Sequence, residues 1–309
     1  MAEALAQIEA RETAPETIEL LDLVYQGAKG HVLGITGPPG VGKSTLIAAL
    51  IKAYRGRGES VGVIVIDPSS RRSGGALLGD RVRIDIDPSD PDVFIRSMAA
   101  RERMGGLAAI TAAAVVVMRS VYDKVVVETV GVGQSETDIA SVADSILLCI
   151  QPGSGDSLQY MKAGIAEIPD IAAVTKTDLG SVAKQTIRDL ASALTMTGRT
   201  TGSSDLLDWQ VPVMGISAVK EAHITELVDA IDRHQHYLDG ERLLTKRSDQ
   251  AETWIELSIK ESHGQYGLDI AKNLAGGFKL ERGQSPFRRL QYLRGLFETD
   301  KLSSKLGSI

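Results

Sequence analysis

The stretch GPPGVGKST at residues 37–45 constrains the fold of this chain more than any other feature. It fits the pattern G-x-x-x-x-G-K-[ST], it follows the β-branched run VLGIT, and it opens a helical pattern at 44–58. Glycines leave backbone N–H groups free to surround phosphates, and the start of the helix adds its positive end. The sequence therefore predicts a phosphate-binding loop, in which Lys43 reaches the β- and γ-phosphates and Ser44 binds Mg²⁺.

Short runs of apolar, mostly β-branched residues recur along the chain. They lie at 32–36, 61–66, 124–128, 145–150, 171–174 and 211–216. Most are apolar throughout, which is typical of strands buried on both faces of a parallel sheet. Helical patterns such as 44–58 and 106–122 separate them. This alternation predicts an α/β fold with a doubly wound, mostly parallel sheet, whose ligands bind at the carboxyl ends of the strands.

Acidic residues stand at or just beyond these predicted strands. Asp67 lies in VIDPSS, Asp80 in LGDRVR and Glu128 in VVVETVG. Because Mg²⁺ prefers oxygen ligands, we expect these three carboxylates and Ser44 around the metal. Capping of a surface turn is the alternative role for any one aspartate. Glu128 begins an E-x-x-G turn that ends at Gly131, whose backbone N–H can approach a γ-phosphate.

Two later motifs concern the base of the nucleotide. The segment TKTD at 175–178 is close to the N-K-x-D pattern of guanine-binding NTPases. Asp178 can accept hydrogen bonds from N1–H and N2–H₂ of guanine, a donor pair that adenine lacks, and the stem of Lys176 can lie over the base. The segment GISAVK at 215–220 can offer a backbone N–H to guanine O6, so the order of motifs favours GTP over ATP. The predicted nucleotide-binding residues are Gly37, Pro39, Gly40, Val41, Gly42, Lys43, Ser44, Thr45, Gly131, Lys176, Asp178, Ser217, Ala218 and Val219.

The pattern divides the 309 residues into three parts. Residues 1–30 predict a short N-terminal helical lead-in, and 31–222 predict the GTPase domain. Residues 223–309 contain charged helical patterns, at 224–244 and 248–277, with no comparable β-run. Because these helices carry apolar residues but no core of their own, we expect a C-terminal dimerisation arm and a homodimer. A helical cap packed back on the domain is the alternative.

Composition excludes some classes of function. A net charge of −6 and a pI of about 5.5 argue against general nucleic-acid binding. The apolar stretch 108–118 is too short to span a membrane and predicts a buried helix, so no membrane partner is expected. The first twenty residues lack the apolar segment of a secretory signal. The single cysteine, Cys149 in SILLCI, permits no internal disulfide, so we expect a buried thiol and a cytoplasmic protein.

Three segments resemble a known family. DPSSRRSGGALLGDRVR (67–83), ETVGVGQSE (128–136) and QPGSGDSLQYMKAGIAEIPD (151–170) are similar to the MeaB/ArgK group, in the G3E branch of P-loop GTPases, where the third motif carries glutamate. The group includes the human methylmalonic aciduria type A protein. The resemblance implies a GTP-hydrolysing chaperone that gates adenosylcobalamin loading, protection or reactivation of an acyl-CoA mutase, such as methylmalonyl-CoA or 2-hydroxyisobutyryl-CoA mutase. It also implies Mg²⁺ and GTP or GDP as ligands, with adenosylcobalamin bound only through the partner mutase.

The resemblance also implies roles for single residues. It places Lys43, Asp80 and Glu128 at the catalytic phosphate and Mg²⁺ site. The candidate switch and partner-coupling residues are Arg83, Gln134, Asp156, Gln159 and Lys162. Thr175 stands where the family more often has asparagine, and its hydroxyl can still tie loops together. The segment FIRSMAARERMGG (94–106) has a more charged middle than the family pattern, which would fit a different mutase partner.

The expected reaction is in-line attack of water on the γ-phosphate, with Lys43 stabilising charge. Gln134 could position the water, although a simple loop hydrogen bond explains it equally well. Because the sequence shows no obvious internal arginine finger, we expect slow hydrolysis that a partner accelerates. The alternatives are a G3E metallochaperone that delivers a metal to an apoenzyme and, less favoured, a kinase. A metallochaperone usually has a Cys/His cluster, whereas the histidines here are scattered: His31, His223, His234, His236 and His263.

Overall fold

The computed structural model describes residues 1–11, 13–68, 84, 86–100, 109–129, 138–153, 167–196, 209–281 and 283–306. Their strands form one parallel sheet in the order β3-β2-β4-β1-β5-β6-β7. The strands are β1 (His31–Thr36), β2 (Val61–Pro68), β3 (Val93–Ala100), β4 (Lys124–Glu128), β5 (Ser145–Ile150), β6 (Ile171–Val174) and β7 (Val213–Gly215). The predicted doubly wound parallel sheet is confirmed.

The strand β3 was not predicted from the sequence pattern. The strand β3 lies at the edge of the sheet and pairs only with β2 in the described part of the chain. Its sequence mixes buried Ile95 and Met98 with half-buried Arg96 and Ser97. Arg96 donates to Glu9 of the first helix at 2.6 Å. An edge strand needs no continuous apolar run, because only part of its surface is covered.

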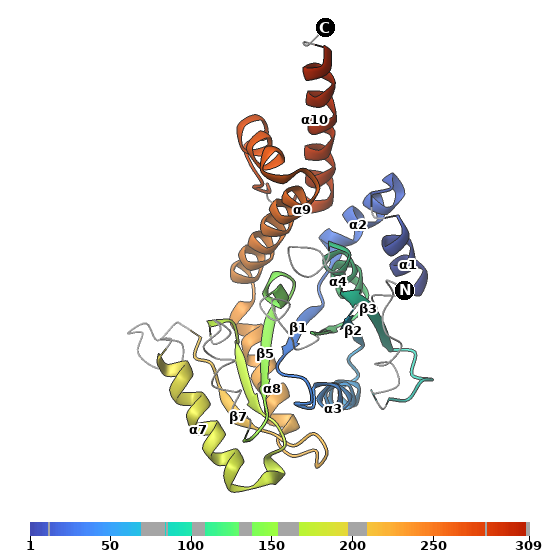
Figure 1. The fold of residues 1–309 in the computed structure, drawn as a ribbon. Coiled ribbons are helices and arrows are strands. Elements are labelled where there is room, and N and C mark those ends of the chain that lie inside the picture. The colour runs from blue at the N-terminus through green and yellow to red at the C-terminus, as the bar shows by residue number, and fades with distance from the viewer. Residues whose placement is uncertain are drawn as a thin grey trace.

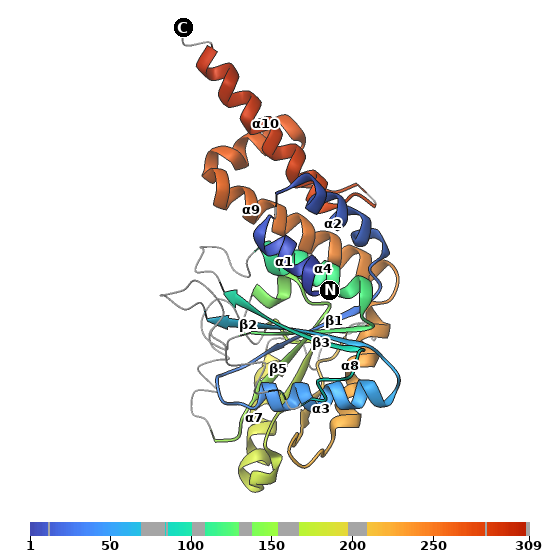
Figure 2. The same ribbon diagram turned by 90° about the vertical axis from the view of Figure 1, so that its right-hand side faces the viewer.

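Helices cover both faces of the sheet (Figure 1). They are α1 (Ala2–Ala10), α2 (Pro15–Gly27), α3 (Lys43–Gly56), α4 (Ala109–Val121), α7 (Ser181–Met196), α8 (Ile224–Leu238), α9 (Glu241–Ala275) and α10 (Pro286–Leu306), with 3₁₀ turns η1 (Ile139–Ser141) and η3 (Thr177–Leu179). Figure 2 shows α1, α2, α4 and the first part of α9 on one face and α3 and α8 on the other. The predicted N-terminal helical lead-in and the buried helix at 108–118 correspond to α1, α2 and α4.

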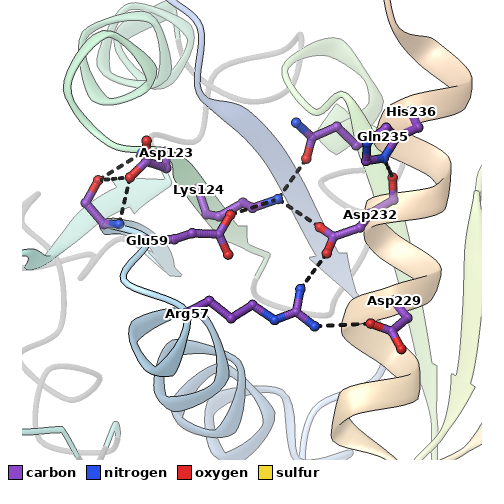
Figure 3. Close-up of polar contacts among 9 residues, drawn as sticks. Arg57, Glu59, Asp123, Lys124, Asp229, Asp232, Gln235 and His236 are labelled. Atoms are coloured by element: carbon purple, nitrogen blue, oxygen red, sulfur yellow. Dashed lines mark hydrogen bonds and ion pairs between the residues drawn. The ribbon is translucent and has the colours of Figure 1, made fainter.

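The helix α8 belongs to the packing of the sheet. Its Leu227 and Ile231 share one core cluster with α3 and the central strands. On the same helix, Asp232 accepts from Lys124 at 2.9 Å and from Arg57 at 2.6 Å (Figure 3). These bonds join α8 to β4 and to the end of α3. The predicted domain boundary at 222/223 stays a prediction, and the part of the chain that projects from the sheet comes later, in the second part of α9 and in α10.

The C-terminal helices differ from the predicted bounds. The predicted helix 224–244 ends earlier, at Leu238, because Gly240 adopts a positive φ of 73° between α8 and α9. The helix α9 then runs to Ala275 with one non-helical residue, Gly264. Together with α10 it projects away from the sheet (Figure 1). The helical C-terminal part is therefore confirmed, and its role in dimerisation stays a prediction.

Cys149 lies in the core, as expected. Its side chain is fully buried on β5, and burial raises the pKa of the thiol to about 12. Within the described ranges, none of the helices has the length and apolar character needed to cross a membrane.

Candidate nucleotide site

The predicted phosphate loop connects β1 to α3 at the carboxyl end of the sheet. Gly37, Gly40 and Gly42 have φ values of 144°, 75° and 101°, which side chains rarely allow. A Cβ on Gly37 would lie 2.2 Å from the carbonyl oxygen of Cys149, so β5 leaves no space there. Gly42 caps the start of α3 in the left-handed conformation. The glycines thus turn the chain tightly and leave the helix start open, as a phosphate site requires.

Lys43 lies under this loop and is 6% exposed. Its Nζ donates to the carbonyl oxygen of Gly37 at 2.7 Å and to that of Pro38 at 3.3 Å. These bonds hold the ammonium group against the loop in which it is predicted to bind phosphate. Pro39 and Thr45 are exposed at the rim of the same loop, and Val41 is buried beneath it.

The predicted metal ligands Ser44 and Glu128 come together. Because β1 pairs with β4, Glu128 stands opposite Ile35, beside the start of the loop. The Ser44 hydroxyl donates to Glu128 Oε1 at 3.3 Å, and the Glu128 side chain is buried. An octahedral Mg²⁺ with ligands at about 2.1 Å holds neighbouring oxygens about 3 Å apart. The two oxygens therefore fit adjacent positions on Mg²⁺. Asp67 lies on β2, the other neighbour of β4.

The loop of the TKTD motif, residues 175–178 and here called the base loop, is hydrogen-bonded directly to the phosphate loop. The Thr175 hydroxyl donates to the carbonyl oxygen of Val41 at 2.7 Å. Lys176 donates from Nζ to the carbonyl oxygen of Gly40 at 2.8 Å and to Gln151 Oε1 at 2.9 Å. The expectation that the Thr175 hydroxyl ties loops together is confirmed. Sequence reasoning missed Gln151, although it follows directly on a predicted strand.

Asp178 is exposed at the end of the same loop, in the 3₁₀ turn η3. The Ser217 hydroxyl donates to its Oδ1 at 2.8 Å, and this bond is the main cause that lowers the pKa of Asp178. Ser217 is itself buried and is fixed by an antiparallel bridge to Ala222. A preset, ionised carboxylate at this position is an acceptor for N–H groups of a base. Ala218 is half-buried beside it, and Val219 is 83% exposed.

Several predicted site residues lie outside the described part of the chain. They are Asp80, Arg83, Gly131, Gln134, Asp156, Gln159 and Lys162. Their roles stay predictions.

The histidines are less scattered than the sequence indicated. His31 Nε2 and His234 Nδ1 lie 2.8 and 2.6 Å from the hydroxyl of Ser145, and Asp170 lies 3.5 Å from His234 Nε2. All four side chains are buried, which leaves a substrate no approach. Burial lowers the pKa of His31 to about 3, so it is neutral. Within the described ranges, no group of three or more His, Cys, Asp or Glu side chains could hold a metal ion.

The chain is similar to several known proteins. The family model described as "Methylmalonyl Co-A mutase-associated GTPase MeaB" matches residues 1–265. A Pyrococcus abyssi protein that carries the name GTPase is 45% identical over 247 residues, which cover 78% of this chain and 74% of that protein. The mouse mitochondrial methylmalonic aciduria type A homolog is 37% identical over 235 residues, 74% of this chain and 55% of its own length.

Solved structures share the fold. A crystal structure of a LAO/AO transport system kinase superposes with a TM-score of 0.63 at 25% identity and covers 96% of this chain and 92% of its own. The nickel complex of HypB from Helicobacter pylori reaches a TM-score of 0.51 at 13% identity over 72% of this chain and 96% of its own, which shows a common fold alone.

Proposed function

Because the chain belongs to the MeaB family of methylmalonyl-CoA mutase-associated GTPases, we propose that its GTP cycle gates adenosylcobalamin loading, protection or reactivation on an acyl-CoA mutase of that type. The chain is a GTPase with the G3E form of the P-loop fold. The observation that carries the residue assignments is the bonding of the base loop to the phosphate loop by Thr175 and Lys176. The base and the phosphates of one nucleotide would therefore contact two loops that are hydrogen-bonded to each other.

Hydrolysis requires water to attack the γ-phosphorus while the bond to the β–γ bridging oxygen breaks, which gives GDP and phosphate. In this chain Lys43 would exchange its bonds to loop carbonyls for the β- and γ-phosphate oxygens and stabilise their charge. Ser44 and Glu128 would hold Mg²⁺, which neutralises phosphate charge when bound. The N–H groups at the start of α3 would complete the phosphate contacts.

Base selection would rest on Asp178. Its carboxylate would accept from guanine N1–H and N2–H₂, with Ser217 fixing its orientation. Replacing Asp178 by asparagine keeps the oxygen that Ser217 needs but turns one acceptor into a donor. Xanthine carries an oxygen where guanine carries N2–H₂, so the variant should prefer xanthine.

The test is nucleotide affinity of Asp178→Asn protein, with Asp189→Asn, an exposed aspartate on α7, as the matched control. The loss of one charge-assisted bond to a donor–donor contact and the loss of charge assistance for the other, worth about 3–4 kcal/mol together, should weaken GDP binding by roughly a hundredfold or more. Xanthosine diphosphate should bind the variant more tightly than GDP. Equal loss for both nucleotides, or an unchanged affinity for GDP, would contradict the assignment.

Coupling to the mutase is tested by adding a purified methylmalonyl-CoA mutase as the probe. Phosphate release should rise by roughly tenfold or more when the mutase is present, because a partner can order the switch loops. Transfer of adenosylcobalamin to apo-mutase, followed by its absorbance spectrum, should change between GTP and a non-hydrolysable analogue. Lys43→Ala protein should show neither effect. The gating role would be refuted if the mutase did not change the rate of phosphate release and if cofactor transfer were the same with GTP and with the analogue.

We also propose that the arm of α9 and α10 makes a homodimer. The arm projects from the sheet and exposes Tyr266 and Tyr292, at 52% and 54%. Analytical ultracentrifugation of the full chain and of a Tyr266→Ser, Tyr292→Ser variant tests this. A monomer at micromolar concentration for the unchanged chain would refute it.

A further inference from the structure

A small cavity lies in the helical layer formed by α2, α4, α9 and α10. It is about 40 Å³ in volume and lies among α2, α4, the segment after η1, α9 and α10. Its walls are mainly apolar, with Trp254 of α9 and Phe287 of α10 packed edge to face at 5.2 Å. The guanidinium of Arg119, from the last turn of α4, also lines it.

Arg119 forms no direct ion pair with the described part of the protein. Arg119 is 7% exposed, and its Nε is buried without a hydrogen-bond partner. No described carboxylate lies within 4.0 Å of the guanidinium, which lies over the ring of Tyr25, 5.6 Å from the ring centroid. Burial, and then repulsion from Arg247, lower the pKa of Arg119 to about 10, so it remains protonated at neutral pH. A buried charge without a partner is costly, and proteins rarely keep one without a use.

The other buried cationic side chains of the described residues, Lys124 and Lys43, each have an anion or an expected anion beside them. Lys124 has Asp232 at 2.9 Å and Glu59 at 3.6 Å. Lys43 lies under the phosphate loop, where the P-loop motif brings phosphate charge to the lysine. By this comparison Arg119 also lies where an anion is expected to arrive.

The charges around the cavity add up to an excess of one positive charge. Arg247 lines the cavity beside Arg119, and one carboxylate, Asp144, faces both. Arg247 takes both oxygens of Asp144, at 2.9 and 2.7 Å, and Val32 N–H donates to the second oxygen at 2.8 Å. Asp144 therefore neutralises Arg247 and leaves the charge of Arg119 uncompensated.

We propose that this cavity is a binding site for a small monocarboxylate, whose oxygens pair with the Arg119 guanidinium. One water molecule needs roughly 10–15 Å³ of such cavity volume. The 40 Å³ therefore hold about three water-sized groups, which is the size of a carboxylate. A planar guanidinium matches carboxylate geometry. The indole N–H of Trp254, which also lines the cavity, is buried and has no hydrogen-bond partner among the described residues, so it is a further donor. A nucleotide is far too large. The carboxylate can belong to a free acid or to a side chain of a second copy of this chain.

The experiment follows the two indole N–H resonances of full-length protein labelled with ¹⁵N-tryptophan. Trp209 Nε1 donates to the carbonyl oxygen of Asp170 at 2.7 Å and serves as the internal reference. Sodium acetate is titrated to 100 mM against sodium chloride at constant ionic strength. We expect a saturable shift of the Trp254 resonance with acetate, no shift of Trp209, and a rise in melting temperature that chloride does not give.

Arg119→Met keeps the length of the side chain and removes its charge, and Arg288→Met, at an exposed arginine, is the matched control. The Arg119 variant should lose the acetate shift and melt no lower than the unchanged protein, while Arg288→Met and the charge-preserving Arg119→Lys should keep the shift. A Trp254 shift that depends on protein concentration and that acetate suppresses would assign the carboxylate to a second copy. An absent shift, or an equal shift in Arg119→Met protein, would overturn the site. None of these readouts depends on GTP or on a mutase, so the result is separate from the proposed function.

Discussion

One buried ion pair contributes to the attachment of α9 to the sheet, beside its apolar contacts, and breaking it gives the sharpest prediction for stability. Asp144 is fully buried at the start of β5, and Arg247 is the α9 residue that binds it through two hydrogen bonds. Arg247 also donates to the carbonyl oxygens of Ala28 and Gly30, at 3.2 and 2.9 Å. One side chain of α9 thus joins three segments that are far apart in the sequence.

Replacing Asp144 by asparagine keeps the shape but removes the charge. The amide presents N–H groups to Arg247, which is only 12% exposed, and leaves two buried arginines with no neutralising carboxylate. Breaking a buried pair from one side costs about 3–5 kcal/mol, and we expect this loss at pH 7. Burial alone would raise the pKa of Asp144, but the hydrogen bonds and the charge of Arg247 outweigh burial and lower this pKa in the folded protein. Its contribution is therefore complete above the unfolded pKa of about 3.9 and is lost only as the pH falls through the lower folded value.

The assay is urea unfolding in a double-mutant cycle of Asp144→Asn and Arg247→Met, followed by circular dichroism. Asp249→Asn, an exposed aspartate on α9, is the matched control and should change the free energy of unfolding by less than about 0.5 kcal/mol. The two single changes should each be costly, and the double change should cost less than their sum by about 1–3 kcal/mol. Additive losses, or a loss below about 1 kcal/mol for Asp144→Asn, would refute the reasoning.

Three further predictions concern single residues. Gly37→Ala should lower the melting temperature and abolish nucleotide binding, because its Cβ would lie 2.2 Å from the Cys149 carbonyl oxygen; calorimetry with GDP measures both. Thr175→Val should lose the 2.7 Å bond to Val41 and about 1–3 kcal/mol of stability, while Thr175→Ser should retain most of it, as urea unfolding would show. His31→Gln should make the free energy of unfolding fall less steeply with decreasing pH. The pKa of His31 is about 3 in the folded protein against an ordinary 6.5, so below pH 6.5 only the unfolded chain binds this proton. In the unchanged protein this binding lowers the free energy of unfolding by up to about 1.4 kcal/mol per pH unit. An unchanged slope between pH 6.5 and 4 would contradict the last prediction.

Local patterns were sufficient for much of the site. The spacing of glycines around Lys43 predicts the phosphate loop, and its place between a strand and a helix is confirmed. Continuous apolar runs predict buried strands, and six of the seven strands in the described residues coincide with such a run. The edge strand β3 was missed because its half-covered residues follow no apolar run.

Contacts between distant segments could not be read from such patterns. Nothing in the sequence around Arg247 indicates that its partner is Asp144, more than a hundred residues earlier. His31 and His234 look scattered along the chain, yet Ser145 joins them.

The sequence by itself determined the parallel sheet, the phosphate loop and the family, because these depend on residues that are close neighbours in the chain. Only the tertiary structure decided that α8 packs with the sheet, that Arg247 of α9 pairs with Asp144, and that Arg119 is buried beside a cavity without a direct ion pair to any described residue. Burial and ion pairing are properties of the assembled layers, since each needs surfaces from several helices and strands at once.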